Sequence, residues 1–321
     1  MADQRNSNIG QNPKPSTQAK RRVRAQGADI KGTLLVAVLR AMSILPLAVL
    51  RFKGLCLGWL LWRFNAQAAK VSRENLTYAY PVLPDSQRER LVLTSLQESG
   101  KTGFEMAAVW ARGEGWLQNH IVAEENPELL HSNDMGKGVM VLSPHVGNWE
   151  VLSGYLGQAC RDITVMYQPA QLPALDDLIR TARLRNIKVA PADRSGVMML
   201  MKALRGGEAV GLLPDQVPTE GAGEYADFYG KPALTMTLIR QLHKKTQANI
   251  VMVFALRVPG GFKIVCQNPH PDIYSEQPDI ALLGLNKSVQ QCIDPQPSQY
   301  QWQYKRYRRQ PEGEPRPYRF K

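Results

Sequence analysis

The pattern of hydrophobic and polar positions from residue 136 onward alternates between short apolar runs and longer amphipathic stretches. Such alternation is typical of strands and helices that follow one another in an α/β domain. The apolar runs predict strands over residues 139–142, 163–167, 187–190, 209–213, 249–258 and 262–267. The amphipathic stretches predict helices over residues 148–158, 172–185, 195–205, 232–245 and 279–292. We therefore expect a mixed β-sheet flanked by helices, with the last two strands forming a hairpin across residues 259–261.

The hydrophobic pattern before residue 66 is different. Its first apolar run, residues 34–50, is 17 residues long and contains Arg40, whereas a membrane-spanning helix needs about 20 predominantly apolar residues. Three structures fit this run: a single-pass anchor, a membrane-embedded helical hairpin broken at Pro46 and at residues 51–53, or a buried core helix. Lys and Arg before it favour a cytoplasmic N-terminus if it inserts. We expect a membrane-associated helical segment over residues 33–65.

The excess of basic residues is concentrated at the two ends of the chain. The formal net charge is +12. Residues 1–32 carry seven Lys or Arg against two Asp, and residues 305–321 carry seven against two Glu. We expect a disordered basic arm, an α/β domain over residues 66–304 and a basic tail. Basic arms suit an anionic membrane or nucleic acid, but no recognition helix, zinc finger or RNA-binding aromatic motif is present, so we expect no nucleic-acid partner.

The four cysteines are scattered, without a pair at CxxC spacing. In a chain of this size that distribution predicts free thiols in a reducing compartment. No metal site is predicted.

The stretch around residues 139–150 is the strongest candidate for chemistry. His145 follows an apolar strand, a tight turn at Gly147 and Asn148 comes next, and Glu150 lies five positions after the histidine. Five residues apart on one helix the two side chains could not meet, but at a strand-to-helix junction they can. A histidine oriented by a carboxylate is the minimal general base for activating a hydroxyl. For His145 in isolation, a structural histidine is the alternative.

Polar residues also follow two later strands. Arg194, with an aspartate before it, follows the third predicted strand, and Asp215 with Gln216 follows the fourth. A glycine-containing stretch then leads to Thr235 and is interpreted as a lid. If these strands are neighbours, the loops line one crevice with His145. Arg183, on the helix before Arg194, fits either a cationic rim for phosphates or a solvated helix face.

Several ordered blocks make the chain similar to the bacterial lipid A biosynthesis acyltransferases, within the wider lysophospholipid and glycerol-phosphate acyltransferase superfamily. Residues 143–150 (SPHVGNWE) resemble the family's block in which an acid follows a histidine after four residues. The later blocks that resemble the family lie at residues 202–216, 228–235 (FYGKPALT) and 297–307 (PSQYQWQYKRY). The resemblance covers roughly residues 33–310 and implies a glycerol-phosphate acyltransferase-like fold.

The resemblance implies transfer of a fatty acyl group from acyl carrier protein to a hydroxyl of a lipid A precursor, Kdo2-lipid IVA or its monoacylated product. It implies an inner-membrane enzyme working on the cytoplasmic face without cofactor or metal. His145 would take the hydroxyl proton, and Glu150 would fix its tautomer and stabilise the imidazolium. The backbone amides of Gly147 and Asn148 would stabilise the thioester oxyanion.

Four further residues complete the expected site. Arg194, and with it Arg183, would bind phosphate of the glycolipid. Asp215 would hold that arginine or the lid, beside Gln216. The alternatives are a superfamily member acting on another glycolipid or a lysophospholipid, and a non-enzymatic basic binding protein. An α/β-hydrolase is disfavoured because no Gly-x-Ser-x-Gly motif is present.

Overall fold

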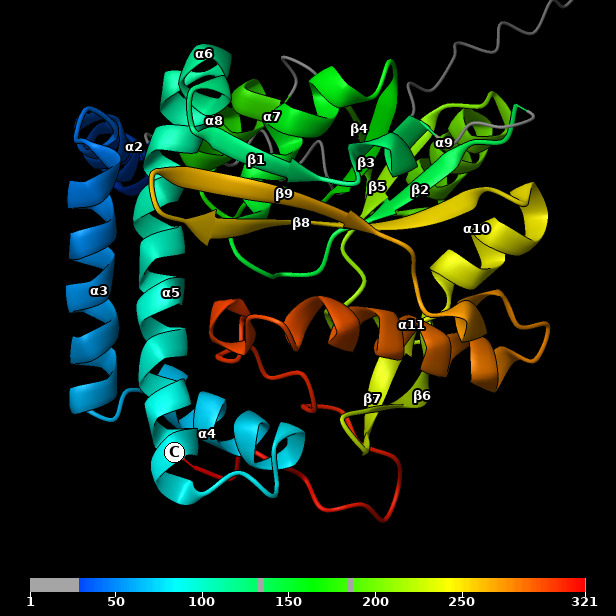
Figure 1. The fold of residues 1–321 in the computed structure, drawn as a ribbon. Helices are drawn as coiled ribbons and strands as arrows, with labels where there is room; N and C mark the ends of the chain where they lie inside the picture. The colour runs from blue at the N-terminus through cyan, green and yellow to red at the C-terminus, as the bar shows by residue number, and fades with distance from the viewer. Residues whose placement is uncertain (1–28, 132–135, 184–186, 321) are drawn as a thin grey trace, which may run out of the picture.

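A seven-stranded mixed sheet organises the chain in the computed structural model, which describes residues 29–131, 136–183 and 187–320 (Figure 1). The strands are β1 (Ile121–Glu125), β2 (Val139–Leu142), β3 (Ile163–Tyr167), β4 (Lys188–Pro191), β5 (Ala209–Leu212), β8 (Asn249–Val258) and β9 (Gly261–Gln267). Their order is β1-β9-β8-β2-β5-β3-β4. All neighbours are parallel except β8 and β9, which form the expected antiparallel hairpin. The predicted mixed α/β fold is confirmed. The expected N-terminal arm lies outside the described residues up to residue 28.

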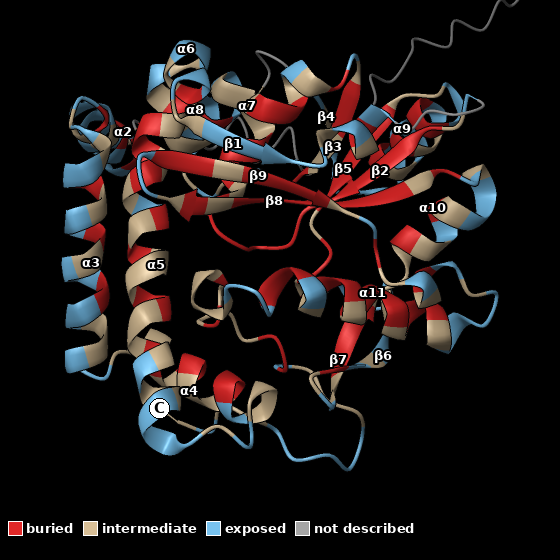
Figure 2. Ribbon diagram, in the orientation of Figure 1, coloured by how far each residue is buried: buried red, intermediate tan, exposed pale blue. Residues whose placement is uncertain are grey.

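Helices cover both faces of the sheet and create two cores. The helices after residue 140 are α7 (Trp149–Ala159), α8 (Pro173–Arg183), α9 (Arg194–Arg205), α10 (Leu238–Thr246) and α11 (Pro278–Ile293). Met140 and Leu142 of β2 belong to the core with α9, α10 and α11, whereas Val139 and Val141 belong to the core with α7. Because β2 is covered on both faces, it is a continuous apolar run. This burial is visible in Figure 2, where the central strands are red.

The N-terminal helices form a separate layer beside the sheet (Figure 1). They are α2 (Ile30–Ser43), α3 (Leu47–Arg63), α4 (Gln67–Ala79), α5 (Asp85–Arg112) and the short α6 (Glu114–Gln118). Helix α3 lies along α5 at very close range. A Cβ at Gly54 would lie 2.4 Å from the backbone nitrogen of Lys101, and one at Gly58 would lie 2.3 Å from Cα of Gln97. Glycine at both positions therefore permits the contact.

Residues 33–65 form two helices that leave one face uncovered. The chain breaks before Pro46, as in the hairpin alternative, but residues 51–53 lie inside α3, so the second break of that alternative is absent. Helix α2 packs against α5 and α8. Among the described residues, no helix combines the length and the apolar character needed to cross a membrane. The outer face of α3 is pale blue or tan in Figure 2, and it includes the exposed Phe52 and Trp59.

Two elements differ from the sequence-based expectation. The predicted helix 232–245 is instead strand β7 (Lys231–Met236), which pairs with β6 (Gly223–Phe228), followed by α10. The expected lid is therefore a hairpin. It is held by the buried Asn286 of α11, which donates hydrogen bonds to the carbonyls of Ala226 and Asp227 at 3.2 and 3.0 Å. Strand β1 was not predicted because it is an edge strand whose residues are mostly exposed.

The remaining turns of helix are short. Three 3₁₀ helices occupy Pro127–His131, Pro271–Tyr274 and Pro297–Gln299. The last of them leads into the segment over residues 300–320, which runs beside α4. Asn75 of α4 donates to the carbonyls of Trp302 and Tyr304, at 2.6 and 2.8 Å. The C-terminal segment is thereby tied to the N-terminal helical layer.

Candidate active site

His145 lies just beyond the end of β2 and is held by a carboxylate from the neighbouring strand. Asp215 follows β5, which pairs in register with β2. Its Oδ1 lies 2.8 Å from Nδ1 of His145, and its Oδ2 accepts the backbone N–H of His145 at 2.9 Å. Both side chains are buried. The two hydrogen bonds fix the imidazole against the end of the sheet.

The other ring nitrogen of His145 faces an amide. Nε2 of Gln216 lies 3.0 Å from Nε2 of His145. Because an amide nitrogen can only donate, this contact requires a lone pair on the imidazole Nε2. Nδ1 then carries the proton and donates it to Asp215. The arrangement presents an imidazole whose Nε2 lone pair can accept a proton from a hydroxyl that takes the place of the Gln216 amide.

The electrostatics of Asp215 favour its ionised form. Burial alone would raise the pKa of this carboxyl, but the charge and the two hydrogen bonds of His145 outweigh burial, and the pKa of Asp215 lies below its usual value. Tyr300 lies beside it, and burial together with the charge of Asp215 raises the pKa of this phenol well above its usual range. The carboxylate is therefore the charged partner of His145, next to a neutral phenol.

Glu150 does not orient His145, which corrects the expectation from spacing. Its Oε2 accepts a hydrogen bond from Nε1 of Trp110 at 2.9 Å, and its Oε1 binds the guanidinium of Arg183. Glu150 is the second residue of α7, and the direction of this helix turns its side chain toward α5 and α8. The guanidinium of Arg183 also stacks over the ring of Tyr167, at 5.0 Å from its centroid. Glu150 therefore belongs to a carboxylate–arginine pair.

The turn between β2 and α7 also differs from the expected oxyanion site. The amide of Gly147 donates to the carbonyl of Gln299 at 2.8 Å, and the amide of Asn148 donates to the carbonyl of Ala255 at 2.9 Å. Both expected donors are thus already used. Gly147 has φ +65°, and a Cβ there would lie 1.9 Å from the oxygen of Ala255. Glycine is required because the turn passes directly against β8.

Arg194 lies apart from the other candidate residues. It is exposed at the start of α9, which follows the edge strand β4. Asp193 caps this helix by accepting the amides of Ser195 and Gly196, at 2.9 and 3.1 Å. Two strands separate β4 from β2 in the sheet order, so this loop does not reach His145. Of the two predicted arginines, Arg183 contacts a predicted site residue, Glu150, and Arg194 does not line the pocket of His145.

A pocket of about 200 Å³ opens at His145. Helix α5 supplies one wall with Ser99, Thr102, Gly103 and Met106, and the C-terminal segment supplies another with Gln299, Gln301 and Gln303. Trp149 completes it, with its ring 4.6 Å from that of His145 between centroids. Gly147, which was predicted as a site residue, also lines the pocket, whereas the residues from α5 and from the C-terminal segment were not predicted. The block at residues 297–307 was the available signal.

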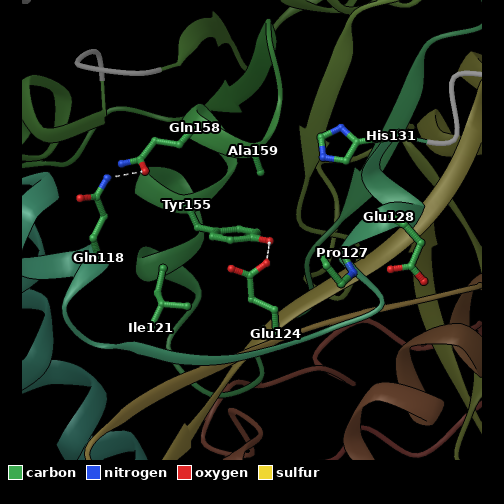
Figure 3. Close-up of a pocket in the computed structure, with 9 residues that line it drawn as sticks. All are labelled: Gln118, Ile121, Glu124, Pro127, Glu128, His131, Tyr155, Gln158 and Ala159. Carbon is green, nitrogen blue, oxygen red and sulfur yellow. Dashed lines mark hydrogen bonds between the residues drawn. The ribbon is translucent and has the colours of Figure 1, made fainter.

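A larger hollow, of about 620 Å³, lies elsewhere on the molecule (Figure 3). In its lining, the hydroxyl of Tyr155 donates to Glu124 at 2.8 Å, with His131 and Glu128 on the opposite side. Neither His145 nor Asp215 lines it. Among the described residues, no group of three His, Cys, Asp or Glu is arranged to hold a metal ion. The small pocket at His145 is therefore the candidate active site.

The sequence matches the family model described as bacterial lipid A biosynthesis acyltransferase over residues 17–309. It is 26% identical to the lipid A biosynthesis lauroyltransferase of Escherichia coli K12, covering 88% of this chain and 93% of that protein. The palmitoleoyltransferase of the same organism is 24% identical over 84% and 88% of the two chains. A lipid A biosynthesis acyltransferase of Haemophilus influenzae is 26% identical over 86% and 90%. The chain belongs to the bacterial lipid A biosynthesis acyltransferase family and is an acyltransferase.

Proposed function

We propose that this chain transfers a fatty acyl group from acyl carrier protein to a hydroxyl of a lipid A precursor, either Kdo2-lipid IVA or its monoacylated product. The observation that carries the proposal is the buried His145, whose Nδ1 lies 2.8 Å from the carboxylate of Asp215 and whose Nε2 lies 3.0 Å from the amide of Gln216. This is the group needed to deprotonate an alcohol as it attacks a thioester. The names of the relatives support a lipid A substrate.

The reaction needs no enzyme nucleophile. The acceptor hydroxyl displaces the amide of Gln216, gives its proton to Nε2 of His145 and attacks the thioester carbon. Asp215 stabilises the imidazolium that forms, as the carboxylate does in a catalytic triad. When the tetrahedral intermediate collapses, the C–S bond breaks and the carrier thiolate takes the proton from His145. The thioester itself supplies the activated acyl group, so the proposal includes no cofactor or metal.

The N-terminus of α7 is the source of oxyanion stabilisation that we propose. The amide of Asn148 is used, and that of Glu150 donates to the side chain of Asn148 at 3.2 Å. Trp149 carries the first amide of the helix and lines the pocket with His145. A helix N-terminus favours negative charge. We assign the amide of Trp149 to the developing oxyanion in place of the amides of Gly147 and Asn148.

Arg183 is the phosphate-binding residue that we propose for the glycolipid. Its guanidinium binds Glu150 through one nitrogen, while its buried Nε has no hydrogen-bond partner among the described residues. A planar guanidinium can bind a carboxylate and a phosphate at the same time. The exposed Arg194 remains available for the outer part of a charged substrate or for the acidic carrier protein.

Changing Glu150 to Gln tests this pairing. We expect kcat/KM for the glycolipid to fall by about ten- to a hundredfold, since the partly buried Arg183 loses its charged partner and its position. The carrier-protein substrate should keep its KM within about threefold. Steady-state kinetics with each substrate varied in turn provides the measurement. An equal rise in the KM of both substrates would contradict the assignment.

We propose that helices α2 and α3 lie in the surface of the cytoplasmic leaflet of the inner membrane. Exposed apolar side chains cover both helices and the residues that follow each. Residues 30–63 also contain five Lys or Arg and no Asp or Glu. A helix with apolar and basic residues and no acids suits the interface of an anionic membrane. This position would bring the pocket to the bilayer that holds the acceptor.

Cys56 gives a direct measure of this membrane contact. It is the one exposed cysteine of the four and lies on α3, whereas burial raises the pKa of Cys160 to about 11 and that of Cys266 to about 12. At neutral pH a maleimide should therefore modify Cys56 first. We expect anionic lipid vesicles to slow this modification about tenfold or more, because the outer face of α3 enters the lipid.

The control for this experiment is Phe52→Asp, one helical turn from Cys56. This change places a carboxylate on the exposed apolar face and should remove most of the protection by vesicles. Equal modification rates of the unchanged protein with and without vesicles would contradict the proposed membrane position.

The test of the proposed reaction is transfer by the purified full chain. Acyl carrier protein carrying a labelled acyl chain is incubated with Kdo2-lipid IVA, and mass spectrometry measures whether the glycolipid gains one acyl group. We expect an acyloxyacyl product that depends on the acceptor. A lysophospholipid that gains the chain while the glycolipid does not would assign the protein to the other substrate class.

A further inference from the structure

A buried ion network lies next to the pocket and bonds two of its lining residues. Glu105 of α5 is fully buried and Arg257 of β8 is 4% exposed in its side chain. Nε of Arg257 donates to Oε2 of Glu105 at 2.7 Å, and Nε of Arg51, on α3, donates to Oε1 at 2.7 Å. Glu98 adds a second carboxylate, 3.2 Å from Arg257. Lys101 also pairs with Glu98, at 2.5 Å, so the two glutamates are shared by two arginines and one lysine.

The network binds the turn that follows His145. One guanidinium nitrogen of Arg257 donates to the carbonyl of Gly147 at 3.1 Å and also bonds the hydroxyl of Thr102. That hydroxyl lies 3.2 Å from the same carbonyl. Nδ2 of Asn148 donates to Oε2 of Glu105 at 3.0 Å, while the oxygen of the same amide caps α7. Both residues of the turn are therefore tied to one charged cluster.

Stability alone is a weak reason for such a network. Burying charges costs several kcal/mol per ion, and apolar residues of similar volume often stabilise a protein as well or better. What the charged groups add is direction, because guanidinium and carboxylate hydrogen bonds are strong and geometrically specific. Here the specified geometry is that of the peptide between His145 and the start of α7.

We propose that Glu105, Arg257 and Thr102 are positioning residues for acyl transfer. They fix the carbonyl of Gly147 and the side chain of Asn148, and thereby the direction of the His145 ring and of the first amide of α7. Arg51 places a second positive charge beside the carboxylate of Glu105. It also donates to the carbonyls of Val258 and Gly261, at 2.8 and 2.7 Å. It thus links α3 to the same cluster. This inference rests on the proposed function only in the tests that measure acyl-transfer kinetics.

The first test compares Arg257→Lys with Arg306→Lys. Arg306 is also a buried arginine, bound to the carbonyl of Leu234 at 2.7 Å and the hydroxyl of Thr235 at 3.0 Å, in the β7 region. Lysine keeps the charge in both variants but loses the planar fork. We expect kcat for acyl transfer to fall about a hundredfold in Arg257→Lys with both KM values within about twofold. Arg306→Lys should keep kcat within about threefold of the unchanged protein, measured at a temperature where both variants remain folded.

Thr102 provides a second, milder test that adds no charge. Thr102→Val keeps the shape but removes the hydroxyl from the carbonyl of Gly147, and we expect about a tenfold loss of kcat. Thr102→Ser should restore most of that loss. A loss in Thr102→Val that serine does not restore would overturn the positioning role of the hydroxyl.

Hydrogen exchange separates this inference from the proposed function. In the full chain, the amides of residues 146–149 should exchange at least about tenfold faster in Arg257→Lys, and not in Arg306→Lys. This readout does not depend on any substrate. If exchange is faster in Arg257→Lys but the unchanged protein transfers no acyl group, the positioning role of the network stands and the proposed reaction is wrong. Unchanged exchange, together with a kcat like that of the control, would overturn the inference.

Discussion

Replacing Asp215 by Asn is expected to lower kcat by about three to four orders of magnitude, with little change in either KM. The asparagine amide can donate to Nδ1 of His145, which would move the ring proton to Nε2. The lone pair on Nε2, which serves as the base, would then be lost, although the ring would keep its place. Acyl transfer in single turnover measures the effect directly.

The matched comparison is Glu150→Gln, which makes the same chemical change at the other candidate carboxylate. Glu150 binds Trp110 and Arg183 and not His145, so its loss should be smaller and should appear in the use of the glycolipid. If Glu150→Gln lost more kcat than Asp215→Asn, the assignment of Asp215 as the partner of His145 would be wrong.

Replacing His145 by Ala is expected to lower kcat by at least about three orders of magnitude, because the base is removed altogether. Asp215 would be left buried, charged and without its partner, so the free energy of unfolding should also fall by about 1–3 kcal/mol. Thermal or denaturant unfolding of each variant separates this loss from the catalytic effect.

The double variant of His145 and Asp215 provides the decisive control for this pair. Residues that act as one unit show losses that do not add. Asp215→Asn should therefore cost little further activity once His145 is Ala. Two full, multiplying losses would mean that Asp215 acts independently of the imidazole.

The partner of His145 was not predictable from spacing along the chain. Asp215 is 70 positions away and meets His145 because β5 is inserted between β2 and β3 in the sheet. Periodicity predicts that strands exist but not their order. Glu150 is near in sequence, but the helix that begins at Trp149 carries its side chain away. The prediction that Asp215 follows a strand near the site was correct, and only its partner was wrong.

The strands and helices after residue 136 were mostly predictable because the sheet is covered on both faces, which makes its strands apolar runs. The β6–β7 hairpin was missed for the opposite reason. Its stability comes from long-range contacts, such as those of Asn286 and of Arg306, and these leave no local pattern. The N-terminal segment was ambiguous because exposed apolar residues look the same in sequence as membrane-spanning ones.

The residues that α5 and the C-terminal segment bring to the pocket were also not predictable from the sequence pattern. The pocket residues of α5 lie 39 to 46 positions before His145, and the glutamines of the C-terminal segment lie 154 to 158 positions after it. These residues are chemically ordinary, and no spacing rule singles them out. Their role follows only from the close approach of α3 and α5 and from the return of the C-terminal segment past β8.

The state of the His145 ring is the most direct test of the proposed mechanism. Nitrogen-15 NMR of histidine-labelled protein at neutral pH, with the signals of His145 assigned by their loss in His145→Ala, identifies which ring nitrogen carries the proton. We predict that Nδ1 carries the proton and donates it to Asp215, and that Nε2 keeps a lone pair, which faces the amide of Gln216. A ring protonated on Nε2, with Nδ1 free, would contradict both the pairing with Asp215 and the role of His145 as the base.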